Sequence, residues 1–429
     1  MADTYFEKAY SKHMAGNRQS ARMLYERIIK RNPMHIDATY MLGTLLAESG
    51  VLELGLMYLK SAAKLKPDSP MIYSNLGHVY LKLGKLDQAR DCYLRSLKLN
   101  PQDPGILFNL GTVFHQQGKL EQAASYIENS LEIKPDFPSA YILLSNIYRE
   151  QNHPDLGAAC LIKFLEYVPD SIEVLFELGN ILAAHQDYAN ASIYFKRILE
   201  IDPDNGSARH AVAALSGETT ATAPRQHVEQ IFDDLSESFD GHLAQLGYRA
   251  PEILKEMIIA LAASQVHFDR AIDLGCGTGL SGLQFRPMVK HLTGLDLSQK
   301  MLDVARTKEI YDELSKADIC QYLESSQQQY DLFIATDVFV YIGDLSDTFR
   351  TISAHARPDA CFLFSTEESL EQDFVLRPTG RYAHSRNYIE KLASTHGFAI
   401  ASSQSINLRM EGQQQIKGGL FALRLNRHG

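Results

Sequence analysis

The sequence predicts two domains: an all-α superhelical repeat array, followed by an α/β domain whose mostly parallel sheet ends in an antiparallel hairpin. Two observations predict this organisation. Six prolines recur at intervals of 34 residues through the first half of the chain, and from about residue 227 short apolar runs alternate with helical segments. A repeat of that length is typical of stacked helix pairs, and such alternation is typical of a parallel sheet. With 429 residues, the chain is long enough to bury two cores.

The composition is that of a soluble protein with unevenly distributed charge. Hydrophobic residues make up 45% of the chain, and no stretch approaches the roughly 20 apolar residues of a membrane span. The N-terminus also lacks the basic-then-apolar order of a signal peptide, so we expect a cytoplasmic protein. Net charge is −10 overall, whereas residues 1–100 carry +6, from 15 basic and 9 acidic residues. Only this part is expected to attract an acidic partner, and the acidic balance elsewhere argues against nucleic-acid binding.

The cysteines predict neither a disulfide framework nor a metal site. They are odd in number, far apart, and form no C-x-x-C pair or Cys/His cluster with metal-ligand spacing. We expect them to be reduced and mostly buried, and we expect no metal. The five are Cys92, Cys160, Cys276, Cys320 and Cys361.

The repeat array covers residues 1–216. Its prolines are Pro33, Pro67, Pro101, Pro135, Pro169 and Pro203. At fixed places before them, a leucine precedes a small residue, as in Leu42-Gly43 and Leu76-Gly77, and twelve residues after the small one comes another small residue, such as Gly55 or Ala89. Small side chains at such places allow two helices to pack closely. Residues 207–215 then predict a closing helix over the last repeat.

This pattern resembles the tetratricopeptide repeat (TPR). The resemblance implies a concave groove that binds an extended protein or peptide partner. Asn75 and Asn109 occupy equivalent first-helix positions that should face this groove, where an amide can bond both the N–H and the C=O of a peptide. The alternative is that both are solvated groove residues, since only two positions of the series carry asparagine.

Residues 217–226 predict a linker, because the segment is small, polar and broken by Pro224. The second domain is expected over residues 227–429, beginning with a helix over 227–246. Its expected strands are residues 271–274, 292–296, 332–336, 361–365, 399–403 and 420–425. The last two lie close enough in sequence to form an antiparallel hairpin.

A glycine-rich turn follows the first expected strand. There, Asp273 precedes Gly275, Gly277 and Gly279, which gives D-x-G-x-G-x-G. Glycine lets backbone approach a ligand closely because it has no Cβ. The overlapping G-x-G-x-x-G at residues 277–282 also fits a dinucleotide site, so the turn alone leaves a nicotinamide or flavin cofactor open.

The turn and the positions after it resemble class I S-adenosylmethionine (SAM) dependent methyltransferases, which have a Rossmann-like fold. The resemblance implies that Asp273 and the three glycines contact SAM. It also implies ribose binding by the strand-end acid and its neighbour, adenine binding by a later acid–apolar pair, and an acid at the methyl end. These positions are Asp296 and Leu297, Asp318 and Ile319, and Asp337. The alternatives are helix capping by Asp296 or Ser298 and by Asp318.

The acceptor side is less determined. After the fourth strand, residues 336–339 read Thr-Asp-Val-Phe, without the Asn/Asp-Pro-Pro-Tyr/Phe element of amide and nucleobase N-methyltransferases. The sequence shows no triad of acidic residues with metal-ligand spacing, which disfavours metal-assisted O-methylation. A later loop holds Arg381, Tyr382 and His384 together, and we expect it to form the acceptor wall, with His384 as base and Arg381 holding an anion. The alternative is that Tyr382 and His384 tie down the loop while Ser385 caps a helix.

Aromatic residues in and after the leading helix, with Phe-Asp-x-His-Leu and a later Tyr-x-x-Pro, resemble bacterial proteins that couple TPR arrays to methyltransferases. Phe239 or Tyr248 could close over SAM, whereas Phe232 and Leu243 are expected to pack on the sheet. The sequence therefore predicts a SAM-dependent methyltransferase whose array recruits or selects a protein or peptide-linked acceptor. Alternatives are a small-molecule methyltransferase using the array for oligomerisation or scaffolding, and a non-catalytic SAM-binding adaptor. The oligomeric state is left open.

Overall fold

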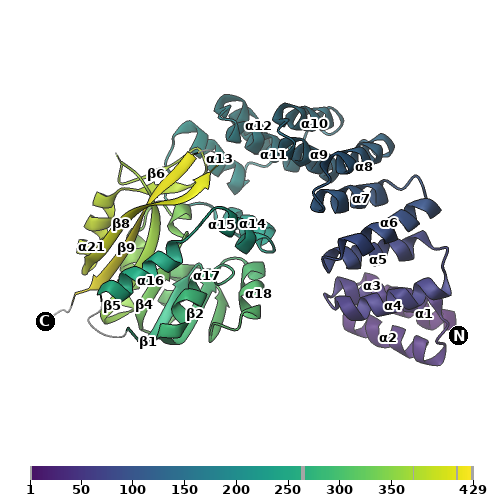
Figure 1. The fold of residues 1–429 in the computed structure, drawn as a ribbon, viewed down its shortest axis with the longest axis horizontal. Coiled ribbons are helices and arrows are strands. Elements are labelled where there is room, and N and C mark those ends of the chain that lie inside the picture. The colour runs from purple at the N-terminus through teal and green to yellow at the C-terminus, as the bar shows by residue number, and fades with distance from the viewer. Residues whose placement is uncertain (1, 262–265, 371, 412–413, 427–429) are drawn as a thin grey trace. The chain divides into compact units, whose positions relative to one another are not determined.

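The chain divides into two compact units, Met1–Ile181 and Leu182–Gly429. The computed structural model describes residues 2–261, 266–370, 372–411 and 414–426. Stacked helices form the first unit, and helices around a sheet form most of the second (Figure 1). The two-domain fold class expected from the sequence is therefore confirmed, although the units divide within the last predicted repeat rather than at the predicted linker.

Antiparallel helix pairs build the array. The first five pairs and the start of the sixth comprise α1 Ala2–Met14, α2 Arg18–Arg31, α3 Ile36–Glu48, α4 Leu52–Leu65, α5 Pro70–Lys82, α6 Leu86–Leu99, α7 Pro104–Gln116, α8 Leu120–Ile133, α9 Pro138–Glu150, α10 Pro154–Tyr167 and α11 Ile172–Ala184. Leu42 is fully buried, and a Cβ on Gly55 would lie 2.9 Å from the carbonyl oxygen of Gly43. The small residues predicted at these places are thus required by close helix packing.

The turn within each helix pair has a second 34-residue period. One residue there takes a positive φ between 62° and 78°, which L-residues other than glycine and asparagine rarely adopt. The six are Gly16, Gly50, Gly84, Gly118, Asn152 and Gln186. The last two pairs therefore keep the turn geometry without glycine, at a local conformational cost of about 1 kcal/mol.

The second unit contains a nine-stranded sheet in which β3, β2, β1, β4 and β5 run parallel in that order, and β9 lies antiparallel to both β5 and β8. Its strands are β1 Phe268–Leu274, β2 Val289–Asp296, β3 Glu313–Lys316, β4 Tyr330–Ala335, β5 Ala356–Glu368, β6 Phe374–Leu376, β7 Tyr382–His384, β8 Phe398–Glu411 and β9 Gln414–Leu425. All six strands expected from the sequence are present. The short strands β3, β6 and β7 were not expected, because three or four residues give no clear alternation.

Helices cover both faces of this sheet. Alternate residues of β4 explain why, since Phe333 faces one hydrophobic cluster while Leu332 and Ile334 face another. The first cluster includes residues of α19 Ile319–Ser325, α20 Ser346–Ala354 and α21 Arg386–Thr395, and the second includes residues of α16 Ala250–Leu261 and α17 Leu280–Phe285. The carboxyl ends of the central parallel strands remain available for a site.

The leading helical segment of this unit is broken. The expected helix over 227–246 is two helices, α14 Arg225–Leu235 and α15 Phe239–Gln245. Before them come α12 Tyr188–Ile201 and the closing helix α13 Gly206–Ser216, which ends at Gly217 with φ 77°. The closing helix predicted from the sequence is confirmed and belongs to the same compact unit as the sheet.

Closing helix α13 docks on the sheet domain through a histidine pair. His210 Nε2 donates to the carbonyl oxygen of Gly380 at 2.9 Å, His227 Nδ1 lies 3.1 Å from the Ser207 hydroxyl, and the imidazole centroids are 5.4 Å apart. Burial, with a smaller effect of His210, lowers the pKa of His227 to about 4. Both imidazoles are therefore neutral at pH 7.

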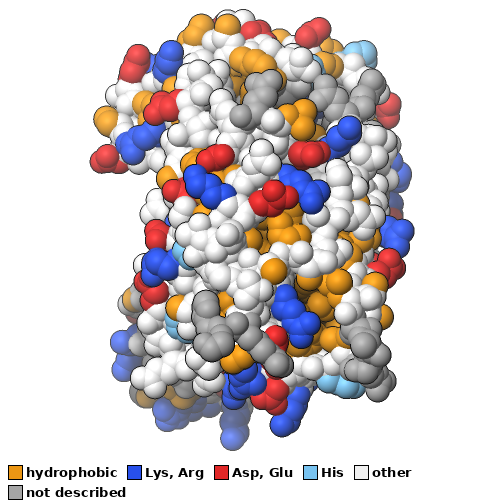
Figure 2. Space-filling model, turned by 90° about the vertical axis from the view of Figure 1, so that its left-hand side faces the viewer, with side chains coloured by type: hydrophobic (Ala, Val, Ile, Leu, Met, Phe, Trp, Pro, Cys, Tyr) orange, Lys and Arg blue, Asp and Glu red, His pale blue; other side chains and the backbone are white. Residues whose placement is uncertain are grey.

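Surface charge is mixed. Acidic and basic side chains are interspersed over much of the face drawn in Figure 2, and hydrophobic side chains are exposed between them. Among the described helices, none is both long and apolar enough to cross a bilayer.

The positive-φ turns give a paired prediction. Gln186→Gly relieves a left-handed glutamine and should raise the unfolding free energy by about 0.5–1 kcal/mol, whereas Gly118→Ala imposes the same strain and should lower it by about 1 kcal/mol. Thermal unfolding midpoints of the full chain measure both. Equal shifts of the same sign would contradict this assignment.

The histidine pair gives a pH prediction. Because the folded-state pKa of His227 lies below the usual histidine value of 6.5, the unfolded state binds the proton more tightly, and stability should fall as pH falls from 6.5 towards 4. The loss attributable to His227 should be about 1–3 kcal/mol. Urea unfolding at several pH values should show a shallower pH dependence for His227→Gln, while the exposed control His267→Gln should follow wild type.

Candidate cofactor pocket

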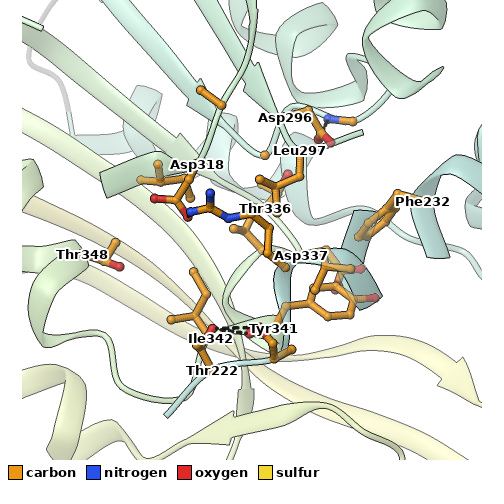
Figure 3. A pocket seen from close by; sticks show the side chains of 18 of the residues that line it. Thr222, Phe232, Asp296, Leu297, Asp318, Thr336, Asp337, Tyr341, Ile342 and Thr348 are labelled. Carbon is orange, nitrogen blue, oxygen red and sulfur yellow. Dashed lines mark hydrogen bonds and ion pairs between the residues drawn. The ribbon is translucent and has the colours of Figure 1, made fainter. Parts of the chain in front are cut away.

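A cavity of about 460 Å³ opens at the carboxyl ends of β1, β2 and β4. This volume lies within the range of small-molecule sites. Its wall combines the glycine turn, the ends of the strands, helices α14 and α15, and residues of the predicted linker (Figure 3). Most of the cofactor positions named from the sequence therefore meet in one place.

The glycine turn is conformationally demanding. Gly275, Gly277 and Gly279 have φ values of 71°, 52° and 96°, in the region that L side chains rarely adopt. A Cβ on Gly277 would meet only the Phe239 ring, at 3.7 Å, so open space lies above the backbone there. Gly275 and Gly277 line the pocket, whereas Gly279 caps the short helix α17.

Asp296 joins the glycine turn to β2. One carboxylate oxygen accepts the N–H of Gly277 at 2.8 Å, and the other accepts the N–H of Ser298 at 2.8 Å. The side chain is nearly buried, and desolvation raises its pKa although these N–H groups oppose the rise. Carboxylate oxygens keep further lone pairs, and Asp296 and Leu297 both line the pocket. Ser298, and not Asp296, caps the helix that follows, because its hydroxyl accepts the N–H of Met301 at 3.1 Å.

Asp273, expected to contact SAM, does not line the cavity. It is fully buried, and it accepts the Tyr311 hydroxyl at 2.6 Å. Burial raises its pKa to about 7. The predicted contact between Asp273 and SAM is therefore corrected. Asp273 holds the Tyr311 hydroxyl in the core below the glycine turn, because its side chain points into the core while the turn faces the cavity.

Asp318 has two roles at once. It is the N-cap of α19, accepting the N–H of Gln321 at 3.1 Å, and it lines the pocket together with Ile319. Its other carboxylate oxygen lies 3.0 Å from Nη2 of Arg225. Capping and ligand contact, which the sequence left as alternatives, are therefore compatible.

Asp337 is held in a left-handed conformation at the end of β4, with φ 58°. Its N–H donates to the Ser365 hydroxyl at 2.9 Å, and its carboxylate accepts Nη1 of Arg409 at 2.8 Å. Burial raises the pKa of Asp337, and the Arg381 charge opposes this. Arg409 is buried and also pairs with Glu367. Sequence reasoning missed Arg409, because it comes from the hairpin 72 residues further along the chain.

The helices before the sheet close one side of the cavity. Phe232, Phe239, Leu243 and Tyr248 all line it, including the two residues expected only to pack on the sheet. The rings of Phe232 and Phe239 meet edge to face at 5.9 Å. Burial, with the Asp337 charge adding to it, raises the pKa of Tyr248 well above its usual value, so this phenol stays protonated.

The predicted acceptor wall is not at the pocket. Arg381, Tyr382 and His384 are not among its lining residues. His384 is 2% exposed, and its Nε2 donates to the carbonyl oxygens of Ile342 and Gly343 at 2.9 and 3.0 Å. Burial lowers its pKa to about 4. The predicted base is therefore corrected to a structural residue, and Ser385 caps α21 as the alternative reading had it.

Tyr382 and Arg381 also hold structure together. Tyr382 is fully buried, and its hydroxyl shares a 2.5 Å hydrogen bond with the Thr220 hydroxyl. Arg381 Nη1 lies 3.8 Å from Oε1 of Glu367, and its charge opposes the burial that raises the pKa of both Asp337 and Tyr341. Arg381 thus influences the pocket from behind its wall, which differs from the anion-holding contact expected of it.

The predicted linker supplies an unexpected part of the wall. Thr222, Ala223, Pro224 and Arg225 line the cavity. Figure 3 shows Thr222 beside Tyr341 and Ile342, with the hydrogen bond from the Thr222 hydroxyl to the Tyr341 carbonyl drawn as a dashed line. A small, polar, proline-containing segment has no sequence signal that distinguishes an adhering strap from a free linker.

In the array, Asn75 is already engaged. Its side-chain N–H groups donate to the Tyr40 hydroxyl at 3.0 Å and to the Thr44 hydroxyl at 2.9 Å, which connects the first helices of two successive repeats. Asn109 is half-buried. Peptide binding by these two amides stays a prediction. Within the described residues, no group of three His, Cys, Asp or Glu side chains is arranged to hold a metal ion.

Comparison with known families identifies both parts of the chain. Models described as "TPR repeat" and "Tetratricopeptide repeat" match residues 77–118, 104–137, 7–70 and 142–206, and a "Methyltransferase domain" model matches residues 272–362. Among solved structures, MamA is 24% identical, with a TM-score of 0.37 over 38% of this chain and 90% of that one.

Curated relatives match the second unit. The malonyl-[acyl-carrier protein] O-methyltransferase of Bacillus anthracis is 31% identical over 23% of this chain and 37% of its own length, and that of Priestia megaterium is 26% identical over 33% and 52%. The ubiquinone biosynthesis O-methyltransferase of Aromatoleum aromaticum is 26% identical over 23% and 43%. The chain thus spans about half or less of the length of these relatives. The chain therefore carries tetratricopeptide-repeat matches followed by a match to a methyltransferase-domain model.

Proposed function

We propose that this protein transfers a methyl group from SAM to a protein or peptide-linked acceptor that its repeat array recruits. The observation that supports SAM as the cofactor is the hydrogen bond between Gly277 and Asp296. A buried carboxylate at the end of β2 lies against bare backbone at the end of β1, and both line one cavity. This arrangement suits a ligand that combines a diol with a chain running over the glycines.

The residues present fit SAM. Asp296 would hold the ribose hydroxyls of SAM, and Asp318 and Ile319 would hold its adenine. The backbone at Gly275 and Gly277 would lie against the amino-acid part of SAM. The charged side chains that line the cavity are Asp296, Asp318, Asp337, Asp344 and Asp347 against one guanidinium, that of Arg225. An acid-rich lining complements a cationic sulfonium.

When bound, SAM supplies a methyl group already activated by the sulfonium, so the protein's task is orientation and exclusion of water. Phe232, Phe239 and Leu243 form an apolar side that excludes water. Asp337, fixed by Arg409 and Ser365, would orient the acceptor at the methyl end. With His384 sequestered, the carboxylate of Asp337 is the group we assign to accept an acceptor proton.

Three considerations support a macromolecule-linked acceptor. Repeat arrays typically present an extended surface to protein or peptide partners, and residues 1–100 carry the net positive charge that would attract an acidic one. The name of two relatives also specifies an acceptor carried on a protein. A small-molecule acceptor is the second candidate, favoured by the ubiquinone biosynthesis relatives.

The ribose assignment is tested by Asp296→Ala. Loss of a buried carboxylate that bonds the ribose should weaken SAM binding by at least about 2–3 kcal/mol, which is roughly 30- to 150-fold. Isothermal titration of the full chain measures it, with NADH as a second ligand that wild type should not bind. Asp303→Ala, an exposed acid on the following helix, should bind SAM as wild type does. Undiminished affinity in Asp296→Ala would remove the ribose assignment.

Another prediction concerns the array. SAM carrying a labelled methyl group is added to cell extract with either the full chain or a fragment of residues 182–429, which keeps α12, α13 and the predicted linker. Both should bind SAM, but only the full chain should label proteins above background. A fragment that labels the same proteins equally well would contradict recruitment by the array, whereas label found only in small molecules would favour the small-molecule alternative.

A further inference from the structure

The strap, defined as residues 219–225, connects closing helix α13 to α14. It does not leave the surface of the second unit. The carbonyl oxygen of Ala221 accepts the N–H groups of Gly343 and Asp344 at 2.9 and 2.8 Å, and the N–H of Ala223 donates to the carbonyl oxygen of Tyr341 at 3.0 Å. Thr222 and Ile342 thereby form an antiparallel bridge. The strap thus adds a short extended strand to residues 341–344.

Residues 341–344 are also fixed from their other side. His384 Nε2 donates to the carbonyl oxygens of Ile342 and Gly343 at 2.9 and 3.0 Å. The hydroxyl of Tyr388 donates to the carboxylate of Asp344 at 2.9 Å. Residues 341–344 thus form a platform for the strap that is held in place independently of it and has little freedom to move with it.

One end of the strap is bound to the β6–β7 hairpin, on which closing helix α13 also docks. The Thr220 hydroxyl bonds that of Tyr382, and the N–H of Leu376 donates to the Thr219 hydroxyl at 3.3 Å. His210 of α13 bonds the carbonyl of Gly380 in the same loop. A small hydrophobic cluster encloses the junction and consists of Ala213, Ala214, Ala223, Val228, Leu376 and Tyr382.

The other end of the strap lies in the pocket. Thr222, Ala223 and Pro224 line it, and Arg225 reaches across to Asp318 at 3.0 Å and to the side-chain oxygen of Gln321 at 3.1 Å. In Figure 3, Thr222, Tyr341 and Ile342 lie together on one side of the cavity that Asp318 and Asp296 also border. The strap therefore contacts the cavity at one end and, at the other, the hairpin on which the closing helix docks.

We propose that the strap is a positioning element of the cofactor pocket that links ligand binding to the docking of closing helix α13. A ligand in the pocket holds the strap on its platform and so holds α13, and release of α13 loosens the wall and weakens the ligand. Such coupling is reciprocal by thermodynamic necessity. The ligand is SAM, so this inference rests on the function proposed above.

Two substitutions outside the pocket test one direction of the coupling. Tyr382→Phe removes only the hydroxyl that holds Thr220, and His210→Gln weakens the contact of α13 with Gly380. Neither residue lines the cavity, yet each should weaken SAM binding by the full chain on the order of 5-fold or more. The matched controls are Tyr330→Phe, on a buried tyrosine that lies outside the pocket lining, and Arg209→Gln, on the exposed neighbour of His210; both should bind SAM as wild type does.

Hydrogen exchange on the unmodified full chain tests the other direction. Saturation with SAM or S-adenosylhomocysteine should slow exchange at the amides of Ala223, Gly343 and Asp344 and along α13, whereas α3 and α5 should not change. If the wild type bound SAM, neither Tyr382→Phe nor His210→Gln weakened that binding, and the ligand left exchange in α13 unchanged, the linkage would be overturned. The proposed function would still stand. A wild-type protein that bound no SAM would overturn the proposed function and, with it, this linkage.

Discussion

The hydrogen bond from the Gly277 N–H to the Asp296 carboxylate is the interaction on which the pocket depends. It joins the turn after β1 to the end of β2, the adjacent parallel strand. It requires a residue at position 277 that tolerates a φ of 52°, and it requires an acceptor oxygen from Asp296, whose pKa is raised by burial while the neighbouring N–H groups oppose that rise. The second N–H, from Ser298, helps to keep that charge in place. Removing either partner would leave a buried polar group unpaired, which is why this pair tolerates little change.

A second set of contacts determines how far the pocket extends beyond the parallel sheet. The strap and residues 341–344 bond each other through their backbones, so their pairing depends on chain path rather than on side-chain type. Tyr382 and His384, which look like catalytic groups in the sequence, are used to fix this pairing. The low pKa of His384 follows from its burial, which disfavours the charged imidazole more than the two carbonyl groups favour it.

The part of the pocket wall around Asp337 is organised by the hairpin of β8 and β9. Arg409 reaches from β8 to Asp337 and Glu367, and both carboxylates are largely buried. A buried arginine between two carboxylates satisfies charges that would otherwise oppose folding. It also keeps Asp337 in its left-handed conformation, so the strand that closes the sheet contributes to the geometry of the site.

The sequence by itself determined the features that depend on local spacing: the 34-residue helix pairs, the alternating strands, and the glycines and acids that lie within a few residues of a strand end. Asp296, Leu297, Ile319 and Asp337 line the cavity for that reason, since the ends of parallel strands meet at one edge. Tertiary structure alone decided which side chains face the ligand and which face the core. Asp273, Tyr382 and His384 were taken into the interior, while residues 222–225 and Arg409 became part of the site or its support through contacts that join segments many residues apart. Those contacts depend on chain path and burial, which no local pattern of residues records.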